Sequence, residues 1–139
     1  MGSWEMDRVS KSTRSRIMAA VQTHDTGAER AVRSIAHRLG FRFSLVRNDL
    51  PGKPDLTFVS RRKLIFVHGC FWHGHRCRYG RLPKSRLGYW KPKISANKLR
   101  DRKQVNRLRK AGWSVMIVWQ CELKKRDALS ARIWKFLHG

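Results

Sequence analysis

The feature that most constrains how this chain can fold is a short segment, residues 67–77, in which cysteine, histidine and large aromatic side chains are crowded together. The segment holds three of the six histidines and two of the three cysteines, and it contains the adjacent aromatic pair Phe71–Trp72. The third cysteine, Cys121, follows a second apolar run far downstream. Side chains of these types can bind a metal, catalyse a reaction or insert between stacked bases. Which role applies depends on the parts of the chain that the fold brings to this segment.

The composition indicates one domain with a polyanionic partner. A chain of 139 residues is long enough to bury one core but not to divide into two. It contains 32 lysines and arginines but only 9 acidic residues, which gives a formal net charge of +23. Residues 61–110 contain 17 basic residues and a single acid, Asp101. Self-repulsion of this size contributes nothing to the stability of a fold, so we expect the charge to serve binding to nucleic acid.

The sequence argues against a membrane, the other partner that a basic chain can have. No apolar run approaches the roughly 20 residues that a spanning helix needs, and the N-terminus lacks the apolar core of a signal peptide. Three cysteines cannot all pair within one chain, and two of them lie among histidines, so a disulfide framework is not expected. We therefore expect a protein of the reducing cytoplasm.

Apolar periodicity and turn residues predict an α/β fold in which a mixed sheet has helices on both faces. Residues 1–25 are polar and are expected to form a flexible arm that contacts the nucleic acid, whereas 26–139 are expected to form a single domain. The predicted helices are 26–39, 95–111 and 125–137, and the predicted strands are 41–46, 56–59, 64–67 and 113–119. A long loop, 68–92, precedes the second helix, and loops of this length are usually functional or tethered by a metal.

Four residues have the chemistry and spacing of a zinc site. Cys70, His75 and Cys77 follow the spacing C-x4-H-x-C. Cys121 can supply a third thiolate from the end of the last strand. Zinc prefers tetrahedral sulfur and nitrogen ligands, and a closed site of this kind leaves no position for substrate, so it would be structural. His73 is the competing nitrogen ligand. In the simpler alternative, Cys121 is a small core residue and the other two cysteines are free thiols.

An acid and two histidines suggest a metal-dependent nuclease centre. Asp55 opens one predicted strand, and His68 ends the next. Many nucleases place an aspartate on one strand and a Glu-x-Lys motif on the following strand to hold Mg²⁺. Here Phe66 and His68 occupy the Glu and Lys positions, so the backbone carbonyl of Val67 could supply the missing ligand and an imidazole could replace the lysine. His68 and His73 can act as general acid or base, since the unperturbed pKa of histidine is about 6.5.

Two further acids can take part in such a centre. Asp101 shares one stripe of the basic helix with Val105 and Leu108, so it is expected to point inward, where an acid needs a partner. That partner is either an imidazole of the preceding loop or an arginine. Glu29 lies three residues after Thr26, which is the spacing of a capping box, and capping is the role that this spacing alone predicts.

The aromatic pair has two alternative roles. Phe71 and Trp72 either pack under the loop, as aromatic residues usually do, or project from it. Apolar side chains that enter a base step can kink DNA, and a mismatched step costs least to open. Met18, in the arm, could insert from the opposite groove.

Three segments of the chain resemble the very short patch repair (Vsr) endonucleases. They are Asp49–Asp55 (DLPGKPD), Phe66–Cys77 (FVHGCFWHGHRC) and Gly112–Cys121 (GWSVMIVWQC), and the resemblance extends from about residue 10 to 125. It implies a restriction-endonuclease-like α/β core with a structural Zn²⁺. It also implies Mg²⁺-dependent nicking of duplex DNA 5′ to the T of a T:G mismatch, the lesion left when 5-methylcytosine deaminates. The setting that it implies is the bacterial nucleoid, with a monomeric enzyme acting beside mismatch-repair proteins.

Position by position, the resemblance assigns roles to the residues above. The catalytic group comprises Asp55, His68, His73, Glu29 and Asp101. The contacts to Mg²⁺ are Asp55 and the carbonyl of Val67. The zinc ligands are Cys70, His75, Cys77 and Cys121, and the residues inserted beside the mismatch are Phe71, Trp72 and Met18. The resemblance therefore favours an active-site role for Glu29, which can coexist with capping.

Two other functions stay open. A zinc-containing DNA-binding module without catalysis explains the charge, the cysteines and the aromatic pair. It does not explain why Asp55, His68 and His73 occur together. A nickase of the same fold could instead act on other mismatched, branched or damaged DNA.

Overall fold

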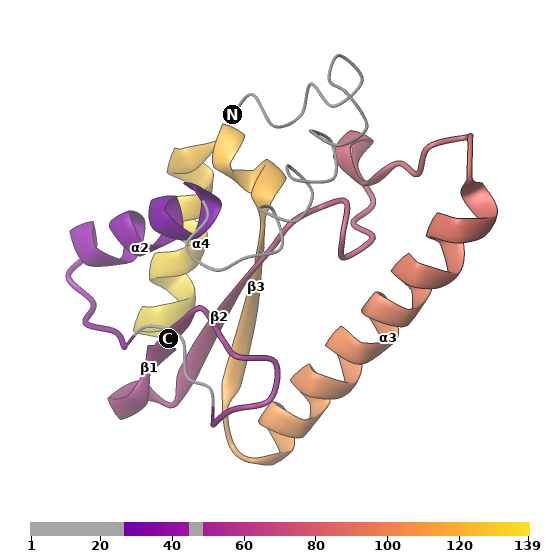
Figure 1. The fold of residues 1–139 in the computed structure, drawn as a ribbon. Helices are drawn as coiled ribbons and strands as arrows, with labels where there is room; N and C mark the ends of the chain where they lie inside the picture. The colour runs from indigo at the N-terminus through magenta and orange to yellow at the C-terminus, as the bar shows by residue number, and fades with distance from the viewer. Residues whose placement is uncertain (1–26, 45–48) are drawn as a thin grey trace.

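The structure, a computed structural model, describes residues 27–44 and 49–139. The expected arm, with Met18, and the capping residue Thr26 lie outside the described residues. The described helices are α2 (Gly27–Arg38), α3 (Leu87–Lys110) and α4 (Arg126–His138), and the strands are β1 (Leu56–Phe58), β2 (Lys63–His68) and β3 (Ser114–Trp119) (Figure 1). Short 3₁₀ segments are η3 (Val59–Arg61), η4 (Arg78–Gly80) and η5 (Gln120–Lys124). None of the described helices is long and apolar enough to cross a membrane.

The three strands form one mixed sheet in the order β1-β2-β3. β1 pairs antiparallel with β2, and β2 pairs parallel with β3 from Lys63↔Ser114 to His68↔Trp119. A parallel pair needs a crossover connection, which here consists of the loop after β2 and the helix α3. Because β2 and β3 run in the same direction, His68 and Trp119 lie side by side where the two strands end.

Helices cover both faces of the sheet, with α2 and α4 on one face and α3 on the other (Figure 1). Successive residues of β2 point to opposite faces. Leu64 and Phe66 therefore join the core under α3, whereas Ile65 joins the core under α2 and α4. The larger core also contains Leu129, Ile133 and Leu137 of α4. This arrangement confirms the predicted α/β class, a mixed sheet flanked by helices.

The strand predicted for residues 41–46 does not form in the described part of the chain. Ser44 pairs with Thr57 through an isolated bridge. The N–H of Phe41 donates instead to the carbonyl of Ala36 in α2, over 3.1 Å, and the Phe41 ring is buried. The alternation of apolar and polar residues here thus reflects rings packed on the core and not the pairing of a strand.

The helix α3 begins before the predicted residue 95 and contains Pro92. Proline has no N–H, so it removes one hydrogen bond from the helix and disfavours the turn before it. In that turn the ring of Trp90 packs against Phe71 and Trp72 of the preceding loop, with centroids 5.1 and 5.8 Å apart. This tertiary contact supports the extra turns, and no local pattern predicts it. The other predicted elements agree with the structure to within one residue at each end.

Two leucines of α3 provide a test of how this helix packs. Leu108 is 1% exposed in the core against the sheet, whereas Leu99 is 47% exposed. We expect Leu108→Ala to lower the free energy of unfolding by about 2–5 kcal/mol, because it removes buried methyl groups and leaves a cavity. Leu99→Ala, the matched control, should change that free energy by less than about 0.5 kcal/mol. Urea unfolding measures both, and equal effects would contradict the orientation of α3.

Candidate functional site

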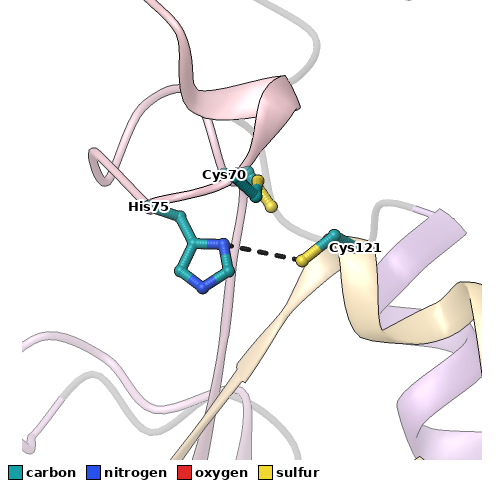
Figure 2. A group of neighbouring side chains, drawn as sticks. Cys70, His75 and Cys121 are labelled. Carbon is teal, nitrogen blue, oxygen red and sulfur yellow. Dashed lines mark hydrogen bonds between the residues drawn. The ribbon is translucent and has the colours of Figure 1, made fainter.

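Four candidate metal ligands converge where β2 and β3 end. Cys70, His75 and Cys77 come from the loop after β2, and Cys121 comes from η5, directly after β3. Their ligand atoms all lie within 4.8 Å of one another. Figure 2 shows three of them, with Nδ1 of His75 3.5 Å from Sγ of Cys121. The parallel pairing of the strands is what brings Cys121 to a loop that is distant in the sequence.

The backbone of this loop is folded tightly around the ligands. The N–H of His75 donates to the carbonyl of Cys70 over 2.9 Å. A Cβ atom at Gly80 would overlap the carbonyl oxygen of His75, so only glycine fits there. Lys124 of η5 lies over the ring of Tyr79, with Nζ 4.4 Å from the centroid. The loop is thus held both by its own backbone and by the turn that follows β3.

The chemistry of the four residues fits zinc. Three sulfur atoms and one imidazole nitrogen are a donor set that structural zinc prefers. Burial raises the pKa of the Cys70 thiol to about 12, against a backbone hydrogen bond at Cys121 and reinforced by hydrogen bonds to the neighbouring thiols. Burial also raises the pKa of Cys121. The four donors lie close enough to share one ion, so this group can hold a metal, and its donors favour Zn²⁺. A bound cation would favour the thiolate form of these cysteines.

A second group consists of His68, His73 and Asp101. Nδ1 of His73 lies 2.5 Å from Oδ2 of Asp101. Partial burial of Asp101 opposes its ionisation, but the hydrogen bond from His73 and the charge of that ring lower the pKa of Asp101 overall. The rings of His68 and His73 stack with centroids 3.8 Å apart and planes inclined by 7°. The Asp101 carboxylate therefore orients the ring of His73, and the ring of His73 stacks on that of His68.

These contacts distinguish His75 from His73, the two histidines that the sequence offers as the nitrogen ligand of the metal. His75 lies with the cysteines, whereas His73 is bonded to Asp101. The side chain of Asp101 is 14% exposed and points inward, as the helical stripe predicts. The alternative partner, an arginine, makes a longer contact: Nη2 of Arg100 lies 3.7 Å from Oδ1 of Asp101.

His68 differs from the expectation that it titrates near neutral pH. Burial, followed by the charge of His73, lowers the pKa of His68 to about 3, so its imidazole is neutral at physiological pH. Its Nδ1 atom is buried and has no hydrogen-bond partner within the described part of the chain. His68 can thus stabilise charge through a hydrogen bond but not as a cation.

Asp55 and Glu29 form a pair of buried acids beside β2. Each is 6% exposed, Asp55 directly before β1 and Glu29 in the first turn of α2. The N–H of Val67 donates to Oδ2 of Asp55 over 2.7 Å. Burial raises the pKa of Asp55 to about 7, against the effect of the Val67 hydrogen bond and reinforced by the carboxylate of Glu29. Arg33 of α2 already lies 3.6 Å from Glu29, and the two carboxylates together offer oxygen ligands of the kind that a hard divalent metal such as Mg²⁺ prefers.

The expected aromatic pair packs with Trp90, and we call these three rings, Phe71, Trp72 and Trp90, the aromatic cluster. Tyr89 packs on its edge, with its ring centroid 4.9 Å from that of Trp90. Phe71 is 6% exposed and meets Trp72 and Trp90 edge to face, at 5.2 and 5.1 Å. Phe71 thus packs under the loop and does not project, while the two half-buried tryptophans form the outer surface of the cluster. Trp90 was missed because it lies in a segment predicted as loop, where no spacing relates it to the pair.

A cavity of about 300 Å³ lies beside the imidazoles, between α3 and β3. Its apolar lining is Val105, Ile117 and Trp119, and its basic lining is Lys98, Arg102 and Arg109. His68, His73 and Asp101 also face it. Pattern alone predicts only packing for Trp119, because its place in the site depends on its pairing with His68.

Known proteins share this fold. The catalytic domain of the homing endonuclease I-Bth0305I superposes with a TM-score of 0.56, covering 81% of this chain and 94% of that domain at 17% identity. At this identity the likeness is one of fold, an α/β core in which acids and imidazoles of this chain gather where β2 and β3 end.

Sequence comparison identifies the family. The family model for the DNA mismatch endonuclease Vsr matches residues 6–79. A type II nicking enzyme of Xanthomonas oryzae pv. oryzae, V.XorIIP, is 54% identical over 131 residues, which are 94% of this chain and 96% of that protein. The DNA mismatch endonuclease Vsr of Escherichia coli (strain K12) is 42% identical over 120 residues, 86% of this chain and 77% of that protein. The chain therefore belongs to the Vsr family of DNA endonucleases, which confirms the resemblance.

Two glutamine variants test which histidine binds the metal. We expect the wild-type chain and His73→Gln to carry about one zinc ion each, whereas His75→Gln should carry clearly less, because it removes the nitrogen beside Cys121. Elemental analysis of purified, dialysed protein measures the content. The two variants are matched in residue type and loop. Loss of zinc from His73→Gln with retention by His75→Gln would reverse the assignment.

Proposed function

We propose that the protein is a Mg²⁺-dependent endonuclease that nicks one strand of duplex DNA 5′ to the T of a T:G mismatch. The nick would start the very short patch repair of deaminated 5-methylcytosine. Membership of the Vsr family supports nicking, and the Escherichia coli relative is by name a DNA mismatch endonuclease. The observation that carries the proposal is the hydrogen bond from Val67 to Asp55, because it holds a buried carboxylate against the strand that ends in His68.

The acids and imidazoles have complementary roles in this proposal. Asp55 and the carbonyl of Val67 would hold Mg²⁺, with Glu29 supporting Asp55. When bound, Mg²⁺ supplies a Lewis acid that polarises the phosphate and lowers the pKa of water. Asp101 holds Nδ1 of His73, so the opposite ring nitrogen can accept a proton from the attacking water. Neutral His68 donates a hydrogen bond to the charge that develops on the phosphate.

The cysteines and His75 would hold a structural Zn²⁺ in this enzyme. The ligands Cys70 and His75 enclose Phe71, Trp72 and His73 in the sequence. A fixed loop therefore sets the distance between the rings that meet the mismatch and the imidazole that acts on the phosphate.

The aromatic cluster would open the mismatched step. Trp72 and Trp90 are its outer rings, so they meet the bases before Phe71, which is covered by both. Separating a stacked step costs a few kcal/mol, and the cost is smallest where pairing is already weakened. Met18 is proposed to enter from the other groove.

Nicking of mismatched duplexes tests the proposed function. Wild-type protein with Mg²⁺ is expected to cut a T:G duplex on the T strand, 5′ to the T, and to leave other mismatches, matched duplex and a four-way junction largely intact. Asp55→Asn should lower the nicking rate by about 100-fold or more but leave binding unchanged, because the amide keeps its oxygen for the Val67 N–H and loses the charge. Denaturing gels of end-labelled strands give the position and rate of each cut.

A matched variant and the substrate panel separate the alternatives. Asp127→Asn changes an exposed acid of α4 and should nick at the wild-type rate. Equal cutting of all mismatches, or of the junction, would replace T:G specificity with a broader preference for distorted DNA. Binding by wild-type protein with no cut on any substrate would assign a DNA-binding module instead.

The basic lining of the cavity predicts contacts to the DNA backbone. Lys98→Ala and Arg109→Ala should each reduce the slope of log K against log salt concentration by about 0.9, since each phosphate contact releases about one counterion. Arg107→Ala, which removes an exposed charge from the opposite side of α3, is the control and should change the slope less. Fluorescence anisotropy without Mg²⁺ measures the slope. Equal changes in all three variants would mean diffuse attraction and no defined contact.

A further inference from the structure

Trp119 lies where the two parts of the site meet. It ends β3, pairs in register with His68 of β2 and precedes the metal-ligand candidate Cys121 by two positions. Its half-buried ring lines the same cavity as His68, His73 and Asp101.

One face of the indole stacks on His75. The ring centroids of Trp119 and His75 are 4.2 Å apart, and the planes are inclined by 14°. Nδ1 of His75 is the nitrogen beside the sulfur of Cys121. The plane of the imidazole decides whether the lone pair of that nitrogen points at the sulfur atoms, and the stacked indole restricts that plane.

The same indole contacts the other two imidazoles. The ring centroid of Trp119 lies 5.3 Å from that of His68 and 6.4 Å from that of His73, with the planes inclined by 75° and 69°. Both are edge-on arrangements, which aromatic rings prefer. His73 has Asp101 as a hydrogen-bond partner. Nδ1 of His68 has none within the described residues, so the orientation of the His68 ring depends on the rings around it.

The backbone of Trp119 is itself held firmly. Its N–H donates to Oε2 of Glu122 over 2.8 Å. Both carboxylate oxygens of Glu122 in turn accept from Arg132 of α4, at 2.9 and 3.0 Å. Arg132 also donates to the carbonyl of Ile117, within β3. An indole on so fixed a backbone can orient its neighbours.

We propose that Trp119 is a positioning residue that couples the zinc loop to the catalytic imidazoles, by stacking on His75 and contacting His68 and His73 with the same ring. Its catalytic consequence rests on the proposed function. The coupling itself is a property of the folded, zinc-loaded chain and does not depend on DNA.

The test compares Trp119→Ala, Trp119→Phe and the control Trp113→Ala. Trp113 is also half-buried, but it lies at the opposite end of β3, where Cζ of Arg62 is 4.3 Å from its ring centroid. Each purified holoprotein is checked for zinc content and circular dichroism. The imidazole signals of His68 and His73 are then recorded by NMR without Mg²⁺, and nicking of a T:G duplex is followed as kcat and KM.

We expect Trp119→Ala to broaden both imidazole signals and to lower kcat by about 10-fold to 100-fold with little change in KM, because loosely held catalytic groups lose alignment. Loss of the indole ring current shifts the signals in any case, so their line widths are the readout. Trp119→Phe keeps an aromatic face and should restore the signals and most of kcat. Trp113→Ala should leave both near wild type. Should Trp119→Ala fail to fold, Trp119→Leu, which keeps bulk without a ring, replaces it.

Two results would overturn the role of Trp119. One is imidazole signals as narrow as those of the wild type in the folded Ala or Leu variant. The other is a Phe variant as impaired as that variant. If the wild-type protein does not nick DNA, the proposed function fails, and the imidazole signals alone still decide whether Trp119 orients the histidines.

Discussion

The parallel pairing of β2 with β3 is the interaction on which the rest of the site depends. It aligns His68 with Trp119 and brings Cys121 to the loop that follows β2. It also requires a crossover, and the helix that forms most of this crossover carries Asp101 to His73. A slip of one residue would turn the side chains at the end of β3 to the opposite faces. Such a slip is costly, because helices bury both faces of the sheet and alternate residues of each strand belong to different cores.

Within the segment 67–77, neighbouring residues are directed to different neighbours by the backbone of the loop. His73 and His75 are separated only by Gly74, which has a left-handed φ of +63°. A Cβ atom at Gly74 would come close to Ile94 and to Lys98 of α3, so the loop lies directly on that helix. One histidine thereby reaches an acid of α3 and the other reaches the sulfur atoms. The close packing of loop and helix is what allows a candidate metal-ligand group and an acid–imidazole pair to share so short a segment.

Much of the fold was predictable because it follows from local periodicity. Alternating and continuous apolar runs located the strands and the helical stripe that turns Asp101 inward. The chemistry of cysteine and histidine likewise indicated the metal-ligand group. The failures have a common cause. The first turns of α3 pack Trp90 on the loop that precedes the helix, and Phe41 bonds to α2 and packs on the core, so that Ser44 alone of residues 41–44 pairs with β1. Both depend on packing contacts that apolar periodicity does not encode.

The sequence by itself determined the charge, the kinds of ligand available and the faces that helices and strands must bury, since these follow from residue type and spacing. Only the tertiary structure decided which histidine joins the cysteines, how Glu29 comes to lie against Asp55, and that Trp119 touches three imidazoles. It also decided the protonation of His68, whose low pKa comes from burial. Desolvation, stacking and hydrogen bonding act over a few ångströms of space, and the residues that act on one another here are contributed by segments far apart in the chain.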